Sequence, residues 1–235
     1  MAQTNLASIA LFGGSFNPVH NGHLRLAVEM WESLRPDRLD FIPTANPPHK
    51  PNASLLPFEL RVELLRAACT AFPAFHISTL EAERPEPSYT AVTLARYREL
   101  YPRAELYFMM GSEDFAGLAT WKDWQRLPEL ANLLILPRQG IEEADFSAAV
   151  RRFWPRAEPC AAGPGWAFTA ARVCFKVNDA DRAGRLLYLP LPRLDINASM
   201  LRRRWLEGRR LDFWTPPAVL DALVAHRELV GQSWR

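Results

Sequence analysis

Short apolar runs alternate with segments of helical periodicity along the first part of the chain. The apolar runs predict strands at residues 6–12, 39–42, 75–78, 105–110 and 132–136. Between them, apolar side chains recur every three or four residues, which predicts helices at 22–35, 58–72 and 89–100. This alternation is typical of a parallel sheet with helices on both faces. We therefore expect an α/β fold with a Rossmann-like open parallel sheet.

The pattern is weaker between Arg138 and Leu194. Residues 142–153 suit a helix, residues 155–165 are rich in turn formers, and residues 186–189 suit a strand. No internal repeat or low-complexity tract interrupts the chain. This segment therefore adds elements to the fold without indicating its own function.

Helical periodicity returns after the weaker segment. A helix predicted at 199–207 ends at Gly208, a residue that favours helix ends. Thr215 is expected to be the N-cap of the last helix, with Pro216 at its first helical position, and that helix is expected to run to about Leu229.

Length and charge limit the function classes. We expect a single domain over residues 1–235, of which about 196–235 form a C-terminal helical part. The chain carries 28 Lys and Arg against 26 Asp and Glu. So small a net charge gives no reason to expect nucleic acid or a membrane surface as a partner. Monomer and homo-oligomer both stay open.

Apolar runs and cysteines indicate the compartment. The longest apolar runs are about seven residues, against roughly 20 for a bilayer-spanning helix. The N-terminus has no basic region before its apolar run, so it does not suit a secretory signal. Three cysteines without CxxC spacing exclude a disulfide framework and argue against a cysteine-rich zinc site. These features predict a soluble, cytoplasmic protein.

The segment from Gly13 to His23 carries the densest chemical signal, Gly-Gly-Ser-Phe-Asn-Pro-Val-His-Asn-Gly-His. It follows the first predicted strand, and ligands of open α/β sheets bind beyond the carboxyl ends of strands. Glycines let backbone amides approach a ligand, and a helix N-terminus favours an anion. His20 and His23 lie three residues apart at the helix start, so both rings can face one point. A glycine turn with capping histidines is the alternative, but loop, spacing and position together favour a phosphate site.

Other ligand motifs fit less well. The chain has no G-x-x-x-x-G-K-[ST] sequence, and Gly163-Pro-Gly165 lacks the third glycine of a dinucleotide fingerprint. A zinc site on His20 and His23 would need a third ligand, and the H-E-x-x-H pattern is absent. We therefore expect no protein-bound metal site.

The Gly13–His23 segment resembles the H-x-G-H signature of the nucleotidyltransferase superfamily, and in particular the bacterial nicotinate-nucleotide adenylyltransferases. Further pieces follow in that family's order: Pro47-Pro-His-Lys50, Glu81-x-x-Arg84, Pro87-Ser-Tyr-Thr-x-x-Thr93, Gly111 followed ten residues later by Trp121, and Ile196-x-x-Ser-x-x-Arg202. The similarity spans roughly residues 6–138 and 190–230. It implies a nucleotidyltransferase-type fold.

Two positions depart from the family's pattern. The family usually has an aspartate two residues after the glycine of its fourth piece, where this chain has Glu113 followed by Asp114. Either carboxylate can fill that role. The family's usual Ile-Ser-Ser-Thr is here Ile196-Asn-Ala-Ser199, which keeps Arg202 in place but loses one hydroxyl.

The resemblance implies adenylyl transfer from ATP, with Mg²⁺, to nicotinate mononucleotide, giving deamido-NAD and pyrophosphate. It assigns the catalytic role to four residues, His20, His23, Lys50 and Arg202. The implied ATP-binding residues are Gly13, Gly14, Ser15, Phe16, His20, His23, Ser199 and Arg202. Those implied for nicotinate mononucleotide are Ser15, Lys50, Thr90, Glu113, Trp121, Lys122 and Arg138.

The resemblance also implies that Trp121 stacks on the pyridine ring and that backbone amides near Thr90 and Lys122 bind the nicotinate carboxylate. Backbone donors suit a carboxylate, which only accepts, better than an amide. Core packing is the alternative for Trp121, although Trp124 suits the core better. A surface ion pair is an equal alternative for Arg138.

Two rival functions remain. One is another nucleotidyltransferase of the same fold, acting on nicotinamide mononucleotide, phosphopantetheine or a choline-like phosphate. The Pro-Ser-Tyr-Thr piece and Trp121 argue against it. The other is a non-catalytic nucleotide-binding protein, against which the complete set of His20, His23, Lys50 and Arg202 argues.

Overall fold

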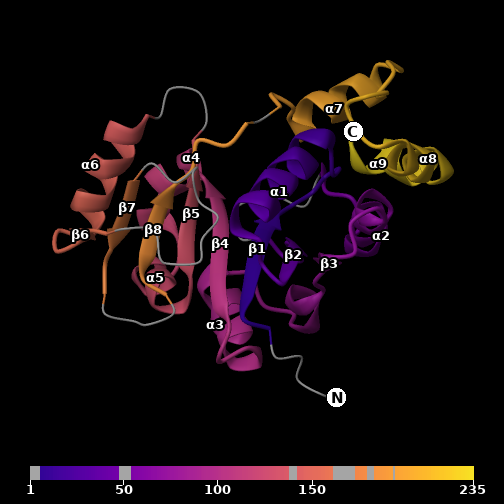
Figure 1. The fold of residues 1–235 in the computed structure, drawn as a ribbon. Coiled ribbons are helices and arrows are strands. Elements are labelled where there is room, and N and C mark those ends of the chain that lie inside the picture. Colours follow the sequence, from indigo (N-terminus) through magenta and orange to yellow (C-terminus); the bar gives the residue numbers. More distant parts are fainter. Residues whose placement is uncertain (1–5, 48–53, 138–141, 161–172, 179–182, 193) are drawn as a thin grey trace. The chain divides into compact units, whose positions relative to one another are not determined.

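A mostly parallel sheet forms the centre of the computed structural model, which describes residues 6–47, 54–137, 142–160, 173–178, 183–192 and 194–235 (Figure 1). Its strands are β1 (Ser8–Gly14), β2 (Arg38–Pro43), β3 (Phe75–Ile77), β4 (Glu105–Gly111), β5 (Asn132–Leu136), β6 (Glu158–Pro159), β7 (Val173–Lys176) and β8 (Arg185–Tyr188). Among the described residues the strand order is β3-β2-β1-β4-β5-β8-β7-β6.

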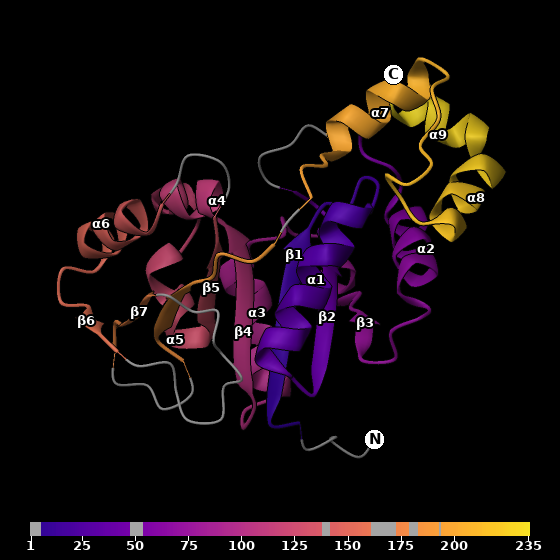
Figure 2. The same cartoon turned by 45° about the horizontal axis from the view of Figure 1, so that its top comes forward.

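Helices connect most of these strands. They are α1 (Asn21–Leu34), α2 (Phe58–Cys69), α3 (Thr90–Leu100), α4 (Ser112–Ala116), α5 (Leu127–Leu130), α6 (Glu143–Phe153), α7 (Ala198–Leu206), α8 (Pro217–Ala225) and α9 (Arg227–Ser233). Figure 2 shows α1 in front of β1 and α3 behind β4. The α/β class predicted from the alternating pattern is confirmed.

The sheet is parallel at its centre and antiparallel at one edge. Strands β1, β4, β5 and β8 pair in parallel, whereas β7 pairs antiparallel with both β8 and β6. Only residues 177–184 separate β7 from β8, and a parallel crossover needs about a dozen residues or more. The short connection therefore accounts for the antiparallel edge.

Backbone contacts divide the chain into two compact units. The first unit comprises Met1–Phe12, Glu29–Leu39 and Tyr89–Leu191; the second comprises Gly13–Val28, Asp40–Ser88 and Pro192–Arg235. The predicted C-terminal helices α7, α8 and α9 all belong to the second unit. The single domain over residues 1–235 stays a prediction.

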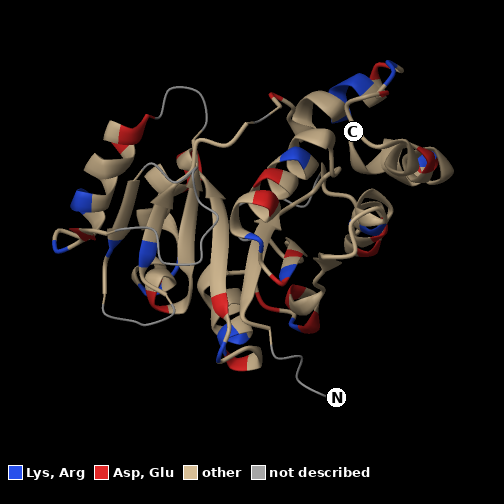
Figure 3. Ribbon diagram, viewed as in Figure 1, with Lys and Arg blue, Asp and Glu red and all other residues tan. Residues whose placement is uncertain are grey.

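An aromatic cluster closes the core of the first unit under α6. The Phe146 side chain is 1% exposed, and its ring lies 5.5 Å from the rings of Phe115 and Tyr188 and 6.0 Å from Phe175. Figure 3 shows that β4 and β5 carry almost no charge, apart from Glu105 at the start of β4. Such strands are typical of a sheet buried on both faces.

Helix α2 packs against α8 in the second unit (Figures 1 and 2). The apolar side chains of Leu60 and Leu64 on α2, and of Val219 and Leu223 on α8, are buried. On each helix these positions lie four residues apart, the spacing that places side chains on one face.

Several elements differ from the prediction. The chain forms β6, β7, α4 and α5, which the pattern did not indicate because each is only two to five residues long. The predicted last helix is two helices, α8 and α9, separated at His226. Thr215 is not an N-cap: Pro216 holds that position, and the Thr215 hydroxyl donates to the Val19 carbonyl instead, at 3.0 Å.

The cysteine spacing gave no reason to expect a disulfide, but the structure has one. Cys160 and Cys174 form a disulfide between neighbouring chain segments at the antiparallel edge, and Cys69 is buried as a free thiol. Burial raises the pKa of the Cys69 thiol to about 12. In the described part of the chain, no helix has both the length and the apolar character needed to cross a bilayer.

Replacing Phe146 with alanine should lower the free energy of unfolding by about 3–5 kcal/mol, because it leaves a cavity among packed rings. Urea unfolding followed by circular dichroism measures the change. The matched control is Phe72→Ala, since the Phe72 side chain is 36% exposed and should cost much less. Equal losses in the two variants would contradict the assignment of Phe146 to the core.

Candidate active site

The loop between β1 and α1 belongs to the second unit and is shaped by Phe16. Phe16 has a φ of 44°, in the left-handed region that bulky residues rarely adopt. Its side chain is 1% exposed, with the ring edge-on to His23 at 5.1 Å and to Phe41 at 5.5 Å. A Cβ on Gly14 would lie 3.1 Å from the Phe16 ring. Phe16 therefore supports the His23 ring from the protein interior, and only its backbone is left to meet a ligand.

His20 and His23 are brought together as the spacing predicted. Their rings are stacked with centroids 3.6 Å apart, and His20 is 4% exposed. The backbone N–H of His20 donates to His23 Nδ1, and that of His23 donates to His20 Nδ1, both at 3.3 Å. A neutral imidazole that accepts at Nδ1 carries its proton on Nε2. Each Nε2 lies on a ring close to a helix N-terminus, where an anion is favoured.

Gly22 makes this arrangement possible. A Cβ at that position would lie 3.0 Å from His20 Nδ1 and 3.2 Å from the Leu194 carbonyl oxygen. That oxygen is backbone and cannot move aside as the end of a flexible side chain would. A side chain at this position would therefore force its neighbours to shift by a few tenths of an ångström.

Residues 213–215 hold the first turn of α1. The Asn21 backbone N–H donates to the Trp214 carbonyl at 2.9 Å, and Asn21 Nδ2 donates to the Phe213 carbonyl at 2.7 Å. Thr215 adds its bond to the Val19 carbonyl. The sequence did not point to these contacts, because they join residues nearly 200 positions apart.

Ser199 and Arg202 lie in contact at the start of α7. Arg202 Nη2 donates to Ser199 Oγ at 3.0 Å, and Nη1 donates to the Asn17 carbonyl at 2.9 Å. Partial burial lowers the pKa of the Arg202 guanidinium, which stays protonated near neutrality. The Asn197 side chain accepts from the Met200 backbone N–H at 2.8 Å and so caps α7. Asn197 thereby takes over the capping role that a hydroxyl has at other helix starts.

Arg61 is a functional candidate that the sequence analysis missed. Its side chain is 1% exposed on α2, with Nη1 donating to the Ser15 carbonyl at 2.9 Å and Nε to the Leu56 carbonyl at 3.0 Å. Burial lowers the pKa of Arg61 to about 10, against opposing effects of Glu59 and Glu81. The group remains a cation at neutral pH, directly behind the loop. The sequence feature that could have identified Arg61 is its position on the apolar face of the predicted helix, among buried leucines.

The proline-rich segment is anchored just before its Pro47–Lys50 motif. Lys50 lies outside the described residues, as does Arg138. Before Lys50, the Ala45 N–H donates to Glu81 Oε2 at 3.2 Å and the Asn46 N–H to Ser88 Oγ at 3.0 Å. The Glu81-x-x-Arg84 and Pro87-Ser-Tyr-Thr pieces are thus tied to the backbone that leads to Lys50.

In the first unit, the structure brings the start of α3 to Lys122. Thr90 is the first residue of α3, where backbone N–H groups lack intrahelical partners. Lys122 Nζ lies 4.6 Å from the centre of the Tyr89 ring. Trp121 is half-buried, and no described residue stacks on its ring. Trp124 packs against Phe153 and Trp154, at 5.2 and 5.5 Å, but it is half-buried too, so it is not the buried core residue that the sequence suggested.

Glu113 and Asp114 both lie in the first turn of α4, and both are exposed. Their placement does not separate them, so each still fits the family's acidic position.

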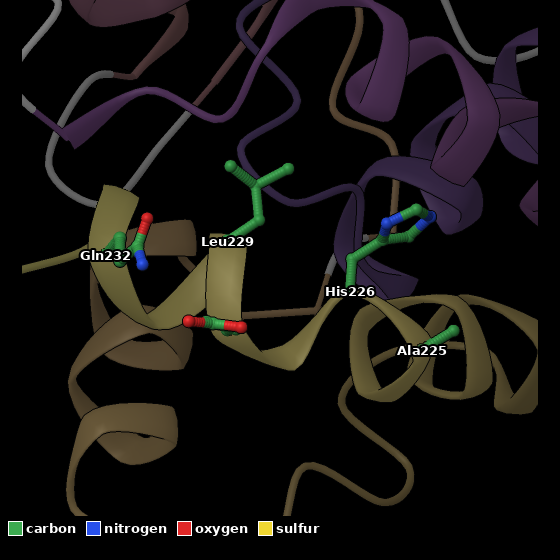
Figure 4. A pocket seen from close by; sticks show the side chains of 5 residues that line it. Ala225, His226, Leu229 and Gln232 are labelled. Carbon is green, nitrogen blue, oxygen red and sulfur yellow. The ribbon is translucent and has the colours of Figure 1, made fainter.

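Two surface hollows lie away from the predicted residues. One, of about 340 Å³, is lined by Ala225, His226, Glu228, Leu229 and Gln232 around the α8–α9 junction (Figure 4). The other, of about 410 Å³, is lined in the first unit by residues of α4, β5 and α6, among them Ser112 and Arg152. Neither contains a residue assigned to ATP or to the mononucleotide.

Known proteins resemble this chain over almost its whole length. A model of the cytidylyltransferase-like family matches residues 11–204. A probable nicotinate-nucleotide adenylyltransferase of Maridesulfovibrio salexigens is 32% identical over 228 residues, covering 97% of this chain and 99% of that protein. Another, of Thermus thermophilus, is 36% identical over 213 residues, covering 90% and 93%.

Solved structures with a similar fold include an adenylyltransferase. The structure of Plasmodium falciparum nicotinic acid mononucleotide adenylyltransferase complexed with NaAD matches with a TM-score of 0.68 at 17% identity, covering 94% of this chain and 97% of that one. The chain therefore belongs to the cytidylyltransferase-like family and, within it, to the nicotinate-nucleotide adenylyltransferases.

Proposed function

We propose that this protein transfers the adenylyl group of ATP to nicotinate mononucleotide, forming deamido-NAD and pyrophosphate in NAD biosynthesis. The observation that carries the proposal is the stacked His20–His23 pair at the start of α1, in a chain whose curated relatives bear that enzyme's name over nearly their full length. ATP and the mononucleotide are its small-molecule substrates, and the cytoplasm, where ATP is supplied, is its proposed compartment.

The reaction needs no general base. An oxygen of the mononucleotide phosphate attacks the α-phosphorus of ATP, the bond from that phosphorus to the bridging oxygen of the β-phosphate breaks, and pyrophosphate leaves with the electron pair. A phosphate monoester has a second pKa near ~6, so the nucleophile is already ionised at neutral pH. The protein's task is to align two polyanions and to stabilise charge at the transferring phosphorus.

The donors of the second unit suit that task. We assign the Nε2–H groups of His20 and His23 to the oxygens at the reacting phosphorus, and Arg202 to the phosphates of ATP. Backbone amides of Gly13, Gly14, Ser15 and Phe16, with Ser199 at the start of α7, complete the ATP side. Lys50 is assigned to the chemical step and to the mononucleotide, as a mobile point charge.

Mg²⁺ fits this site as a companion of ATP. In the described residues, no group of three or more His, Cys, Asp and Glu side chains is placed to hold a metal ion. Mg²⁺ commonly binds through substrate phosphates and water with few protein ligands. When bound there, it neutralises charge on the triphosphate.

We assign the nicotinate side to the first unit. The backbone N–H groups at the start of α3, near Thr90, suit a carboxylate, and Lys122 beside Tyr89 adds a positive charge. Trp121 is assigned to stacking on the pyridine ring, and Glu113 and Arg138 to other parts of the mononucleotide. A coupled assay with ATP and nicotinate mononucleotide, following both deamido-NAD and pyrophosphate, tests the proposed reaction.

Replacing His20 or His23 with alanine should lower kcat by about 10²-fold or more with little change in ATP affinity, because each ring stabilises charge that develops during the reaction. Steady-state rates and ATP binding by calorimetry measure the two effects. Near-normal turnover in both variants would remove the pair from the chemistry.

The Arg202→Lys variant should lose much of its ATP use, since a forked donor that holds the Asn17 carbonyl is replaced by a point charge. The KM for ATP measures this loss. Arg203→Lys on the exposed face of α7 is the matched control and should be unchanged. An Arg202→Lys variant that behaved like this control would exclude Arg202 from the site.

Nicotinate mononucleotide should be preferred over nicotinamide mononucleotide by at least about 10²-fold in kcat/KM. Mispairing a buried donor costs about 1–3 kcal/mol, and the loss of the acceptor's charge adds to it. Trp121→Ala should weaken use of both mononucleotides and keep much of the preference, because stacking is insensitive to the ring substituent. Equal use of the two by the unmodified protein would favour the nicotinamide branch.

A further inference from the structure

The side chain of Asn17 is the most connected polar group of the loop between β1 and α1. It is 4% exposed. Its Nδ2 donates to the Ser54 carbonyl at 2.6 Å, and its Oδ1 accepts from the Leu56 backbone N–H at 3.0 Å and from the indole Nε1–H of Trp234 at 3.3 Å. The backbone carbonyl of the same residue accepts from Arg202. All these residues belong to the second unit.

Asn17 occupies a sensitive position. It follows Phe16, whose ring supports His23, and it precedes His20 by three residues. A shift of Asn17 therefore moves both the backbone that carries the histidine pair and the acceptor that orients Arg202. A misplacement of about 1 Å far from the chemistry can cost about 10²-fold in rate.

Trp234, just beyond the end of α9, is built to hold Asn17. Its side chain is 4% exposed, and its ring packs edge-on against Trp205 of α7 at 5.9 Å. The Arg227 guanidinium lies 5.5 Å from the Trp205 ring. A buried indole N–H is only a donor and needs an acceptor. The acceptor used here is Asn17, although main-chain carbonyls are far more numerous.

We propose that Trp234 is a positioning residue for adenylyl transfer, acting through the Asn17 side chain on the His20–His23 loop and on Arg202. The inference rests on the proposed function and extends it to a residue that touches neither substrate. Trp234 links the fold of α9 to the geometry of the ATP side, so its loss should be felt by ATP and not by the mononucleotide.

The Trp234→Phe variant tests this, because it keeps a packed ring and removes only the Nε1–H donor. We expect kcat to fall about fivefold to tenfold, within the range of one internal hydrogen bond, with a raised KM for ATP and an unchanged KM for nicotinate mononucleotide. Trp205→Phe is the matched control: it keeps a ring at the same contact but has no bond to Asn17, and should retain near-normal kinetics.

A double-mutant cycle tests the route. In an Asn17→Ala background, Trp234→Phe should have no further effect on kcat. The Asn17→Asp background keeps an oxygen acceptor for the indole, so there Trp234→Phe should still lower kcat. This second comparison replaces the first if the Asn17→Ala variant does not fold. Persistence of the effect without the acceptor, equal losses in Trp205→Phe, or lost activity with an unchanged KM for ATP would each overturn the inference.

Failure of the proposed reaction can be distinguished from failure of the positioning role of Trp234. If the unmodified protein makes no deamido-NAD, the proposed function fails, while the positioning role is still measured by ATP binding in calorimetry. Weaker ATP binding by Trp234→Phe but not by Trp205→Phe supports the role in that case, and equal binding overturns it.

Discussion

Five backbone carbonyls at the end of β1 and in the loop to α1 are held from the protein side, and the proposed active site depends on this constraint. Those of Ser15, Asn17 and Val19 each accept a side-chain donor, from Arg61, Arg202 and Thr215 respectively. The carbonyl of Gly14 accepts the Thr44 N–H, and that of His20 accepts within α1. A carbonyl held in this way points to its donor within the protein. In the proposed function the loop is thereby prepared for an anion before one arrives, which is the form of electrostatic stabilisation that costs least reorganisation.

The donors that hold the loop come from distant parts of the second unit. Arg61 belongs to α2, Arg202 to α7, and Thr215 to the segment before α8. Burying these polar groups is costly unless each is hydrogen-bonded. Loop, cation and helix therefore stabilise one another, and removing any of the three donors leaves a buried carbonyl without its partner. This coupling explains why polar residues are buried at this loop.

Local patterns predicted most of the fold and the parts of the site that depend on near neighbours. Alternation gave β5 at its observed bounds and α1 within one residue, and the three-residue spacing indicated that His20 lies beside His23. Contacts over long separations were beyond such patterns. Asn17 and Trp234 are 217 positions apart, and nothing in either local sequence indicates the other. Thr215 was misread because its local preference for an N-cap was overridden by a bond to Val19, 196 positions away.

Phe16 shows what the held carbonyls accomplish. A bulky residue at a φ of 44° costs about 1–3 kcal/mol and persists only where its surroundings over-determine it. Here the carbonyls on either side, of Ser15 and Asn17, are each fixed by a guanidinium, and the ring is wedged between His23 and Phe41. The strained conformation turns that ring inward, beneath His23, so that the imidazole rests on a packed surface. The two arginines therefore act on His23 through the backbone of Phe16, which makes the cationic and the imidazole donors parts of one rigid arrangement.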